Sequence, residues 1–136
     1  MPVRSNSPVQ NKMAGRRGNA ATGRAAYRLG LRAEAFAALM FRLKGYRILA
    51  RRLKTPAGEI DMVVRRGGSL AIVEVKARAQ GEVVEAILPR QQRRLERAAA
   101  HFIGRNPALS GLDLRFDVVL VAPGRLPQHL ADAWRP

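Results

Sequence analysis

The chain has 136 residues, a length that favours one domain. Its 25 Lys and Arg residues against 10 Asp and Glu residues give a formal net charge of +15. This balance favours nucleic acid as a partner, with an anionic membrane surface or a merely soluble basic surface as alternatives. The lack of cysteine excludes disulfides and thiolate metal sites, and no apolar run approaches the roughly 20 residues that span a bilayer.

The N-terminal stretch, residues 1–23, is rich in Pro, Gly, Ser, Asn and Arg and has no apolar periodicity. We therefore expect a disordered basic tail, which either adds phosphate contacts or is an incidental extension. The stretch lacks the apolar segment of a secretory signal peptide, and we expect a cytoplasmic protein without a membrane partner.

The remaining elements follow in chain order. Helical spacing from about residue 24 to 44 predicts a first helix that ends at Gly45, with an apolar stripe of Leu29, Ala33, Phe36, Met40 and Leu43. Strands are predicted at 46–54, 59–66, 69–79 and 114–122. Pro89 begins a second helix, with the stripe Leu95, Ala98, Ala99, Phe102 and Ile103. Residues 123–136 form a C-terminal extension with room for one short helical turn.

The order α-β-β-β-α-β over residues 24–122 predicts an α/β domain with a mixed sheet of about four strands. The first three strands form an antiparallel meander. The helical crossover between the third and fourth strands makes those two strands parallel, with a right-handed connection.

Gly67 and Gly68 suit a two-residue hairpin turn, because glycine accepts a positive φ without penalty. Such a turn places Asp61 opposite Glu74 and Glu59 opposite Lys76. Facing side chains have Cβ atoms about 4.5 to 5.5 Å apart, so two carboxylates there repel each other unless a proton or a cation lies between them.

A divalent cation is one answer, since Mg²⁺ takes one or two protein carboxylates together with waters and phosphate oxygens. Lys76 follows Glu74 on the same face, where its ammonium group could hold a scissile phosphate or orient an attacking water. The alternatives are a solvated polar face with cross-strand pairing of Glu59 and Lys76, and a slip of the register by one residue.

Asp61 followed by Glu74-Val75-Lys76 resembles the motif of the PD-(D/E)XK nuclease superfamily. The blocks "GEIDMVVRRGGSLAIVEVKAR", "LPRQQRRLERAAAHFI" and "RFDVVLV" resemble the small bacterial YraN family over roughly residues 24 to 122. The resemblance implies a restriction-endonuclease-like fold related to Holliday-junction resolvases.

Residue by residue, the resemblance implies metal ligation by Asp61, Glu74 and the carbonyl of Val75, with Lys76 as the catalytic lysine. Glu34 matches an acid that such nucleases bring from the first helix. Glu34 lies roughly 130° from the centre of the predicted stripe, so periodicity alone fits an exposed first-turn acid equally well.

One position departs from the family pattern, because Gln91 stands where a lysine is frequent. Gln91 and Gln92 extend the inward stripe of the second helix and can bind a water or phosphate without adding charge. Asp117 in "RFD" is interpreted as a structural acid that pairs with Arg115 or another basic residue. His101 and His129 have no partner at metal-ligand spacing.

The sequence thus predicts a Mg²⁺- or Mn²⁺-dependent endonuclease acting on DNA. Junction specificity would require a homodimer, which the sequence leaves open. Alternatives are a non-catalytic nucleic-acid-binding module of the same fold and a small interaction subunit. The predicted nucleic-acid contacts are Arg51, Arg52, Arg65, Arg66, Arg78, Gln91, Arg93 and Arg94.

Overall fold

The computed structural model describes residues 24, 28, 30–77 and 87–136. The predicted tail, residues 1–23, lies outside the described residues. Contacts divide the chain into residues 1–32, of which those described are helical, and a second unit, residues 33–136, which holds the sheet.

Within the second unit, the first helix continues from residue 33 to residue 43. The remaining elements are β1 (Arg47–Thr55), β2 (Gly58–Arg66), β3 (Ser69–Ala77), α2 (Pro89–Gly104), the short 3-10 helix η1 (Pro107–Leu109), β4 (Asp113–Val121) and β5 (Gln128–Trp134). Within the described parts of the chain, no helix has both the length and the apolar character needed to cross a membrane.

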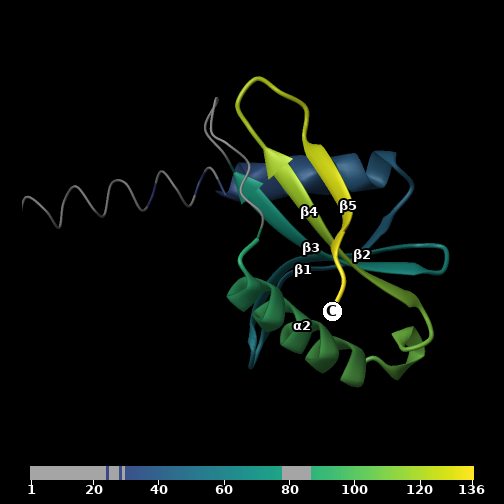
Figure 1. Ribbon diagram of the computed structural model, residues 1–136. Helices are drawn as coiled ribbons and strands as arrows, with labels where there is room; N and C mark the ends of the chain where they lie inside the picture. The colour runs from purple at the N-terminus through teal and green to yellow at the C-terminus, as the bar shows by residue number, and fades with distance from the viewer. Residues whose placement is uncertain (1–23, 25–27, 29, 78–86) are drawn as a thin grey trace, which may run out of the picture. The chain divides into compact units, whose positions relative to one another are not determined.

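The five strands form one mixed sheet in the order β1-β2-β3-β4-β5 (Figure 1). Strands β1, β2 and β3 are antiparallel neighbours, β3 and β4 are parallel, and β4 and β5 are antiparallel. The predicted element order and strand directions are therefore confirmed. The fold is a mixed α/β architecture consistent with the restriction-endonuclease-like class.

The hairpin between β2 and β3 has the predicted register, with Arg66 opposite Ser69. Gly67 has a φ of 58°, a backbone conformation that side chains disfavour and glycine accepts. Gly45 likewise has a φ of 87° where the first helix ends, and the N–H of Tyr46 donates to the carbonyl of Phe41 at 2.9 Å.

Helices cover both faces of the sheet. The first helix packs against Met62, Val64, Ala71 and Val73, which lie on one face of β2 and β3. Helix α2 packs against Val63, Leu70, Ile72 and Phe116 on the other face through Leu95, Ala98 and Ala99, as its predicted stripe requires. Figure 1 shows α2 below the sheet and the first helix on the opposite side. The strands are therefore apolar on both faces.

The predicted stripe of the first helix is confirmed for Ala33, which is buried, and for Met40, which packs against the core. It is wrong for Phe36 and Leu43. The buried residues are Ala33, Ala37, Ala38 and Phe41, whereas Phe36 is 54% and Leu43 is 80% exposed. The three alanines let the helix backbone approach the sheet closely. This face of the helix therefore packs on the sheet, and the larger apolar side chains point to solvent. Leu29 lies outside the described residues.

A fifth strand replaces the predicted helical turn near the C-terminus. Strand β5 pairs with β4, and the ring of Trp134 stacks on Phe116 with 4.9 Å between centroids. The Trp134 indole N–H also donates to Glu96 of α2 at 3.2 Å. These contacts join the end of the chain to the sheet and to the helix beneath it.

Candidate metal and phosphate site

The candidate site lies where β2 and β3 separate. Backbone pairing between these strands runs from the hairpin turn to Met62 opposite Val73 and stops there within the described strands. At the next position, the Asp61 carboxylate accepts the backbone N–H of Val75 at 2.8 Å. A side chain thus replaces a ladder hydrogen bond, and the predicted backbone pairing of Asp61 with Glu74 is not formed.

The alternation of β2 also changes at this point. Ile60 packs with Val63 and Ile72 against α2, although strict alternation would place it on the opposite face with Met62. The strict alternation that would put Ile60, Met62 and Val64 on one face of the strand therefore fails at Ile60. The irregularity at Asp61 turns the end of β2 and directs this carboxyl group toward β3.

The two predicted ligand carboxyl groups do come together. Burial, and after it the neighbouring Glu74, raise the pKa of Asp61 from 3.8 to about 7, although the N–H of Val75 acts in the opposite direction. A raised pKa means that ionisation of Asp61 costs free energy in the folded protein at pH values near neutral. A cation placed beside it would favour the ionised form.

Lys76 lies beside this pair. Its Nζ is 3.4 Å from Oε1 of Glu74, and the two side chains are 26% and 12% exposed. The alternative in which Lys76 pairs with Glu59 is wrong, because the ion partner of Lys76 is Glu74 and Glu59 lies opposite Lys54 in β1. The ammonium group therefore remains at the carboxylate pair and is still reachable from solvent.

Glu34 reaches the same region from the first helix. At about 100° per residue, it lies only about 35° from the mean direction of the four buried residues, so the corrected helix face includes it. Its charge contributes to raising the pKa of Asp61. Its Oε2 accepts a hydrogen bond from Nε of Arg52 at 2.7 Å.

The side chains of this region can supply only some of the ligands of a divalent cation, and water molecules would have to supply others. Among the described residues, no group of three or more His, Asp or Glu side chains is close enough to hold a metal ion. Asp61 and Glu74 offer the two hard carboxylate ligands that Mg²⁺ uses when waters and phosphate oxygens complete its shell. Oδ2 of Asp61 already accepts the N–H of Val75, so part of the acceptor capacity of this carboxylate is in use.

The predicted nucleic-acid-binding residues divide into exposed ones and ones with structural contacts. Arg51 and Arg93 are exposed. Arg65 and Arg94 donate to the carbonyls of Gly67 and Glu59 at 3.0 Å. Gln91 is partly buried on the first turn of α2, and Gln92 donates to the carbonyl of Ile87 at 2.9 Å. Arg78 lies outside the described residues.

Arg66 has a structural role at the end of the first helix. It donates to the carbonyl of Lys44 at 3.1 Å, and its guanidinium lies 4.4 Å from the centroid of the Tyr46 ring.

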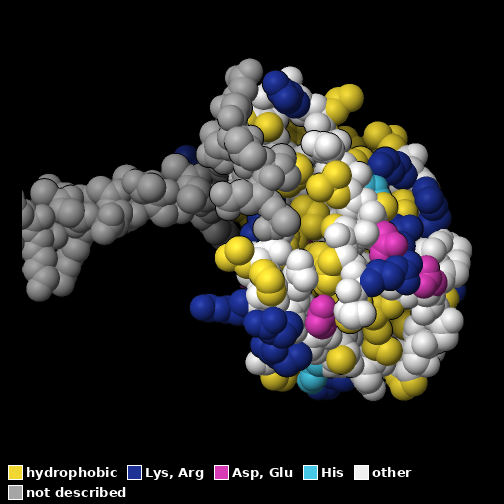
Figure 2. Space-filling view, viewed as in Figure 1, with side chains coloured by type: hydrophobic (Ala, Val, Ile, Leu, Met, Phe, Trp, Pro, Cys, Tyr) yellow, Lys and Arg dark blue, Asp and Glu magenta, His cyan; other side chains and the backbone are white. Residues whose placement is uncertain are grey.

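On the face drawn in Figure 2, Lys and Arg side chains form several groups, one of them over α2, and acidic side chains are few. The surface is therefore suited to polyanions at several places.

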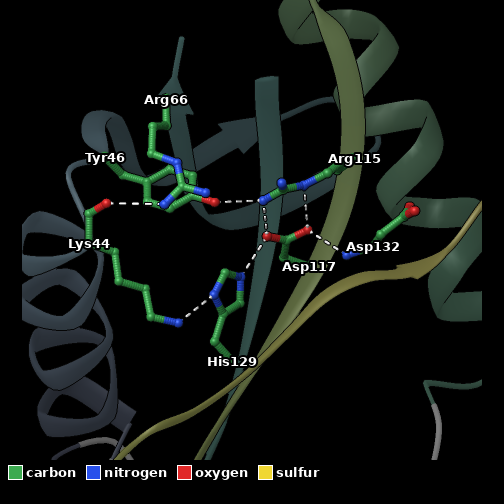
Figure 3. A network of polar contacts seen from close by, with 7 residues as sticks. All are labelled: Lys44, Tyr46, Arg66, Arg115, Asp117, His129 and Asp132. Carbon is green, nitrogen blue, oxygen red and sulfur yellow. Dashed lines mark hydrogen bonds and ion pairs between the residues drawn. The ribbon is translucent and has the colours of Figure 1, made fainter. Parts of the chain in front are cut away.

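A second polar cluster surrounds Asp117, which is fully buried in β4 (Figure 3). Its carboxylate accepts hydrogen bonds from Arg115 at 2.8 Å and from the backbone N–H of Asp132 at 2.9 Å, and it lies 2.7 Å from Nε2 of His129. Burial alone would raise the pKa of Asp117, but these hydrogen bonds together lower it. Asp117 is thus a structural acid that anchors β5 to β4.

Sequence reasoning missed His129 as a member of this cluster. Its Nδ1 lies 3.0 Å from Nζ of Lys44. Since a carboxylate only accepts and an ammonium only donates, the imidazole carries its proton on Nε2. Tyr46 was also missed, although its hydroxyl accepts from Arg115 at 2.9 Å. The members of the cluster come from the turn after the first helix, from β4 and from β5, which are far apart in the sequence and give no local signal of it.

The protein has two acids and a lysine on the inner strands of a mixed sheet, at the point where the strands separate. This arrangement places it in the PD-(D/E)XK-like nuclease superfamily. Comparisons with known proteins give the family. The "Uncharacterised protein family UPF0102" matches residues 33–121, and the chain belongs to this family, the YraN family.

Curated relatives match over most of their length. A UPF0102 protein of Parvibaculum lavamentivorans is 73% identical over 124 residues, which cover 90% of this chain and 93% of that protein. A UPF0102 protein of Paramagnetospirillum magneticum is 54% identical, covering 82% and 90% of the two chains. One of Caulobacter vibrioides is 50% identical with the same coverage.

Proposed function

We propose that this protein is a divalent-metal-dependent endonuclease that acts on DNA phosphodiesters. The observation that carries the proposal is the meeting of the Asp61 and Glu74 carboxyl groups beside Lys76, at the opening between two inner strands. The net charge of +15 supports a polyanionic substrate. A bound Mg²⁺ or Mn²⁺ would supply Lewis-acid stabilisation of the charge that develops on the phosphate.

The chain's own residues have separate tasks in this proposal. Asp61 and Glu74 would hold the cation, with the carbonyl of Val75 as a further oxygen donor. Lys76 would contact the scissile phosphate or orient the attacking water, because its ammonium is held beside Glu74 and remains partly exposed. Glu34 would assist from the first helix.

Cleavage of supercoiled plasmid tests the proposal. We expect wild-type protein to nick DNA in Mg²⁺ or Mn²⁺ but not in EDTA. Lys76→Met and Asp61→Asn should each reduce the rate by about 10²-fold or more, as the loss of a transition-state contact typically does. Glu59→Gln, which neutralises an exposed acid two residues from Asp61, is the matched control and should cleave like the wild type.

Variants that retain the wild-type nicking rate would assign the activity to a contaminant. A wild type that binds DNA with steep salt dependence but never cleaves in either metal would instead support the non-catalytic binding module. Absence of DNA binding at moderate salt would favour the interaction subunit. Calorimetric titration with Mn²⁺ adds an independent readout, because Asp61→Asn should lose the heat of binding if the cation uses this carboxylate.

A further inference from the structure

Arg52 occupies an unusual backbone position beside the carboxylate pair. It lies in β1 between Arg51, which is opposite Met62, and Leu53, which is opposite Ile60, so its own register position faces Asp61. Its φ is 48°, in the left-handed region that a residue with a long side chain rarely adopts. The conformations of Arg52 and Asp61 therefore both depart from regular strand at the same level of the sheet.

The side chain of Arg52 reaches across to the first helix. Its Nε donates to Oε2 of Glu34 at 2.7 Å, and the two side chains are 40% and 14% exposed. The acid is thus held inside the site, whereas the guanidinium lies at its solvent side. The guanidinium presents a planar donor group that matches a phosphate.

The net charge of the site depends on whether a metal ion is bound, and the pairing of Arg52 depends on that charge. Three carboxylates, Glu34, Asp61 and Glu74, are accompanied by the cations Arg52 and Lys76, which leaves a local charge of −1 when all are ionised. One divalent cation changes this charge to +1. Glu34 then no longer needs Arg52 for charge balance, and the site as a whole favours an additional anion.

We propose that Arg52 is an exchangeable counter-ion, which neutralises Glu34 while the carboxylate pair holds no metal and transfers to a nucleic-acid phosphate when a divalent cation binds there. This inference rests on the proposed function, because it uses the same carboxylate pair. It adds a coupling between metal and substrate: each favours the other, since the metal releases Arg52 from Glu34 and the phosphate keeps it released.

The first test measures Mn²⁺ affinity by calorimetry in the absence of nucleic acid. Arg52→Asn removes the competing guanidinium, and asparagine tolerates the left-handed conformation, so the fold should be retained. We expect Mn²⁺ to bind about two- to fivefold more tightly, the equivalent of one released surface ion pair. Arg52→Gly, which suits the backbone even better, is the second variant and should behave in the same way.

The control is Arg47→Asn, which removes the same charge from the exposed start of β1. At physiological salt this more distant charge is screened, so Mn²⁺ affinity should equal that of the wild type. In a Glu34→Gln background, Arg52→Asn should lose most of its effect, because the ion pair that competes with the metal no longer exists. This dependence on Glu34 distinguishes exchange from a general effect of charge.

The second test uses a DNA duplex in EDTA and in Ca²⁺. With Ca²⁺ present, Arg52→Asn should reduce the slope of log affinity against log salt by about 0.9, the value for one phosphate contact. In EDTA the slope should equal that of the wild type, because Arg52 is then paired with Glu34. A slope that falls equally in both conditions would show a permanent DNA contact and overturn the exchange.

The outcomes separate this inference from the proposed function. If Asp61→Asn abolishes Mn²⁺ binding while Arg52→Asn binds Mn²⁺ no more tightly than the wild type, the exchange is overturned and the carboxylate site stands. If the wild type binds no Mn²⁺, or binds it equally well without Asp61, the proposed function fails and the exchange fails with it.

Discussion

In metal-free buffer, the substitution Asp61→Asn should make the protein more stable than the wild type at pH 8. Between its unfolded pKa of 3.8 and its folded pKa of about 7, Asp61 keeps a proton in the folded state that the unfolded chain has released. The free energy of unfolding of the wild type should therefore fall as pH rises through this window and become level above it.

The magnitude follows from the width of that window. A difference of about 3 pH units, at about 1.4 kcal/mol per unit, corresponds to at most about 4 kcal/mol of stability lost by the wild type between pH 4 and pH 8. Asparagine cannot ionise, and its amide oxygen can still accept the N–H of Val75. The variant should therefore lack this decline.

Urea denaturation followed by circular dichroism at pH 4 to 9 in EDTA measures the effect. Asp113→Asn is the control, since Asp113 is 59% exposed at the start of β4 and its loss should shift the curve only slightly. Adding Mg²⁺ at pH 8 should stabilise the wild type but not Asp61→Asn. A variant less stable than the wild type at pH 8 would show that the fold favours the ionised carboxylate, and would refute the reasoning.

Two further predictions concern the scaffold. Asp117→Ala should reduce the free energy of unfolding by about 3 to 5 kcal/mol, because it leaves Arg115 and His129 without their buried acceptor; a loss below about 1 kcal/mol in urea denaturation would contradict that role. Since hydrogen bonds lower the pKa of Asp117, its contribution is present above pH 4 and is lost as pH falls through the folded pKa, a loss that Asp117→Asn should lack. Gly58→Ala should cost about 1 kcal/mol or more, since Gly58 has a φ of 135° and a Cβ there would lie 2.7 Å from Nη1 of Arg94. Gly111→Ala, with open space around the added Cβ, is the control, and equal melting temperatures for the two variants would contradict the argument.

The hairpin and the element order were predictable from the sequence because local chemistry determines them. Two glycines fix the turn, the turn fixes the register, and the register brings Asp61 near Glu74. What the register could not show is that the ladder ends at Met62 and that a side chain takes the place of the next hydrogen bond. The pairing rule describes backbone hydrogen bonds alone, so it does not include such a replacement by a side chain.

The first helix and β5 show why other predictions failed. A stripe chosen by side-chain size selected Phe36 and Leu43, whereas the sheet accepts a close helix face of alanines. The same face includes Glu34, so correcting the stripe also explains how this acid reaches the site. Strand β5 has little apolar alternation of its own and is held by the stacking of Trp134 and by the hydrogen bonds to Asp117. Such tertiary contacts leave no periodic pattern.

The attachment of β5 has a consequence for shortened forms of the chain. Removing residues 128–136 would not simply trim an end, because Asp117 would lose the imidazole of His129 and the amide of Asp132 while its carboxylate stayed beneath the first helix. The new edge, β4, would also present unpaired backbone groups next to apolar side chains, a surface prone to strand exchange between molecules. A C-terminal deletion should therefore show itself as aggregation rather than as a smaller domain with the same behaviour.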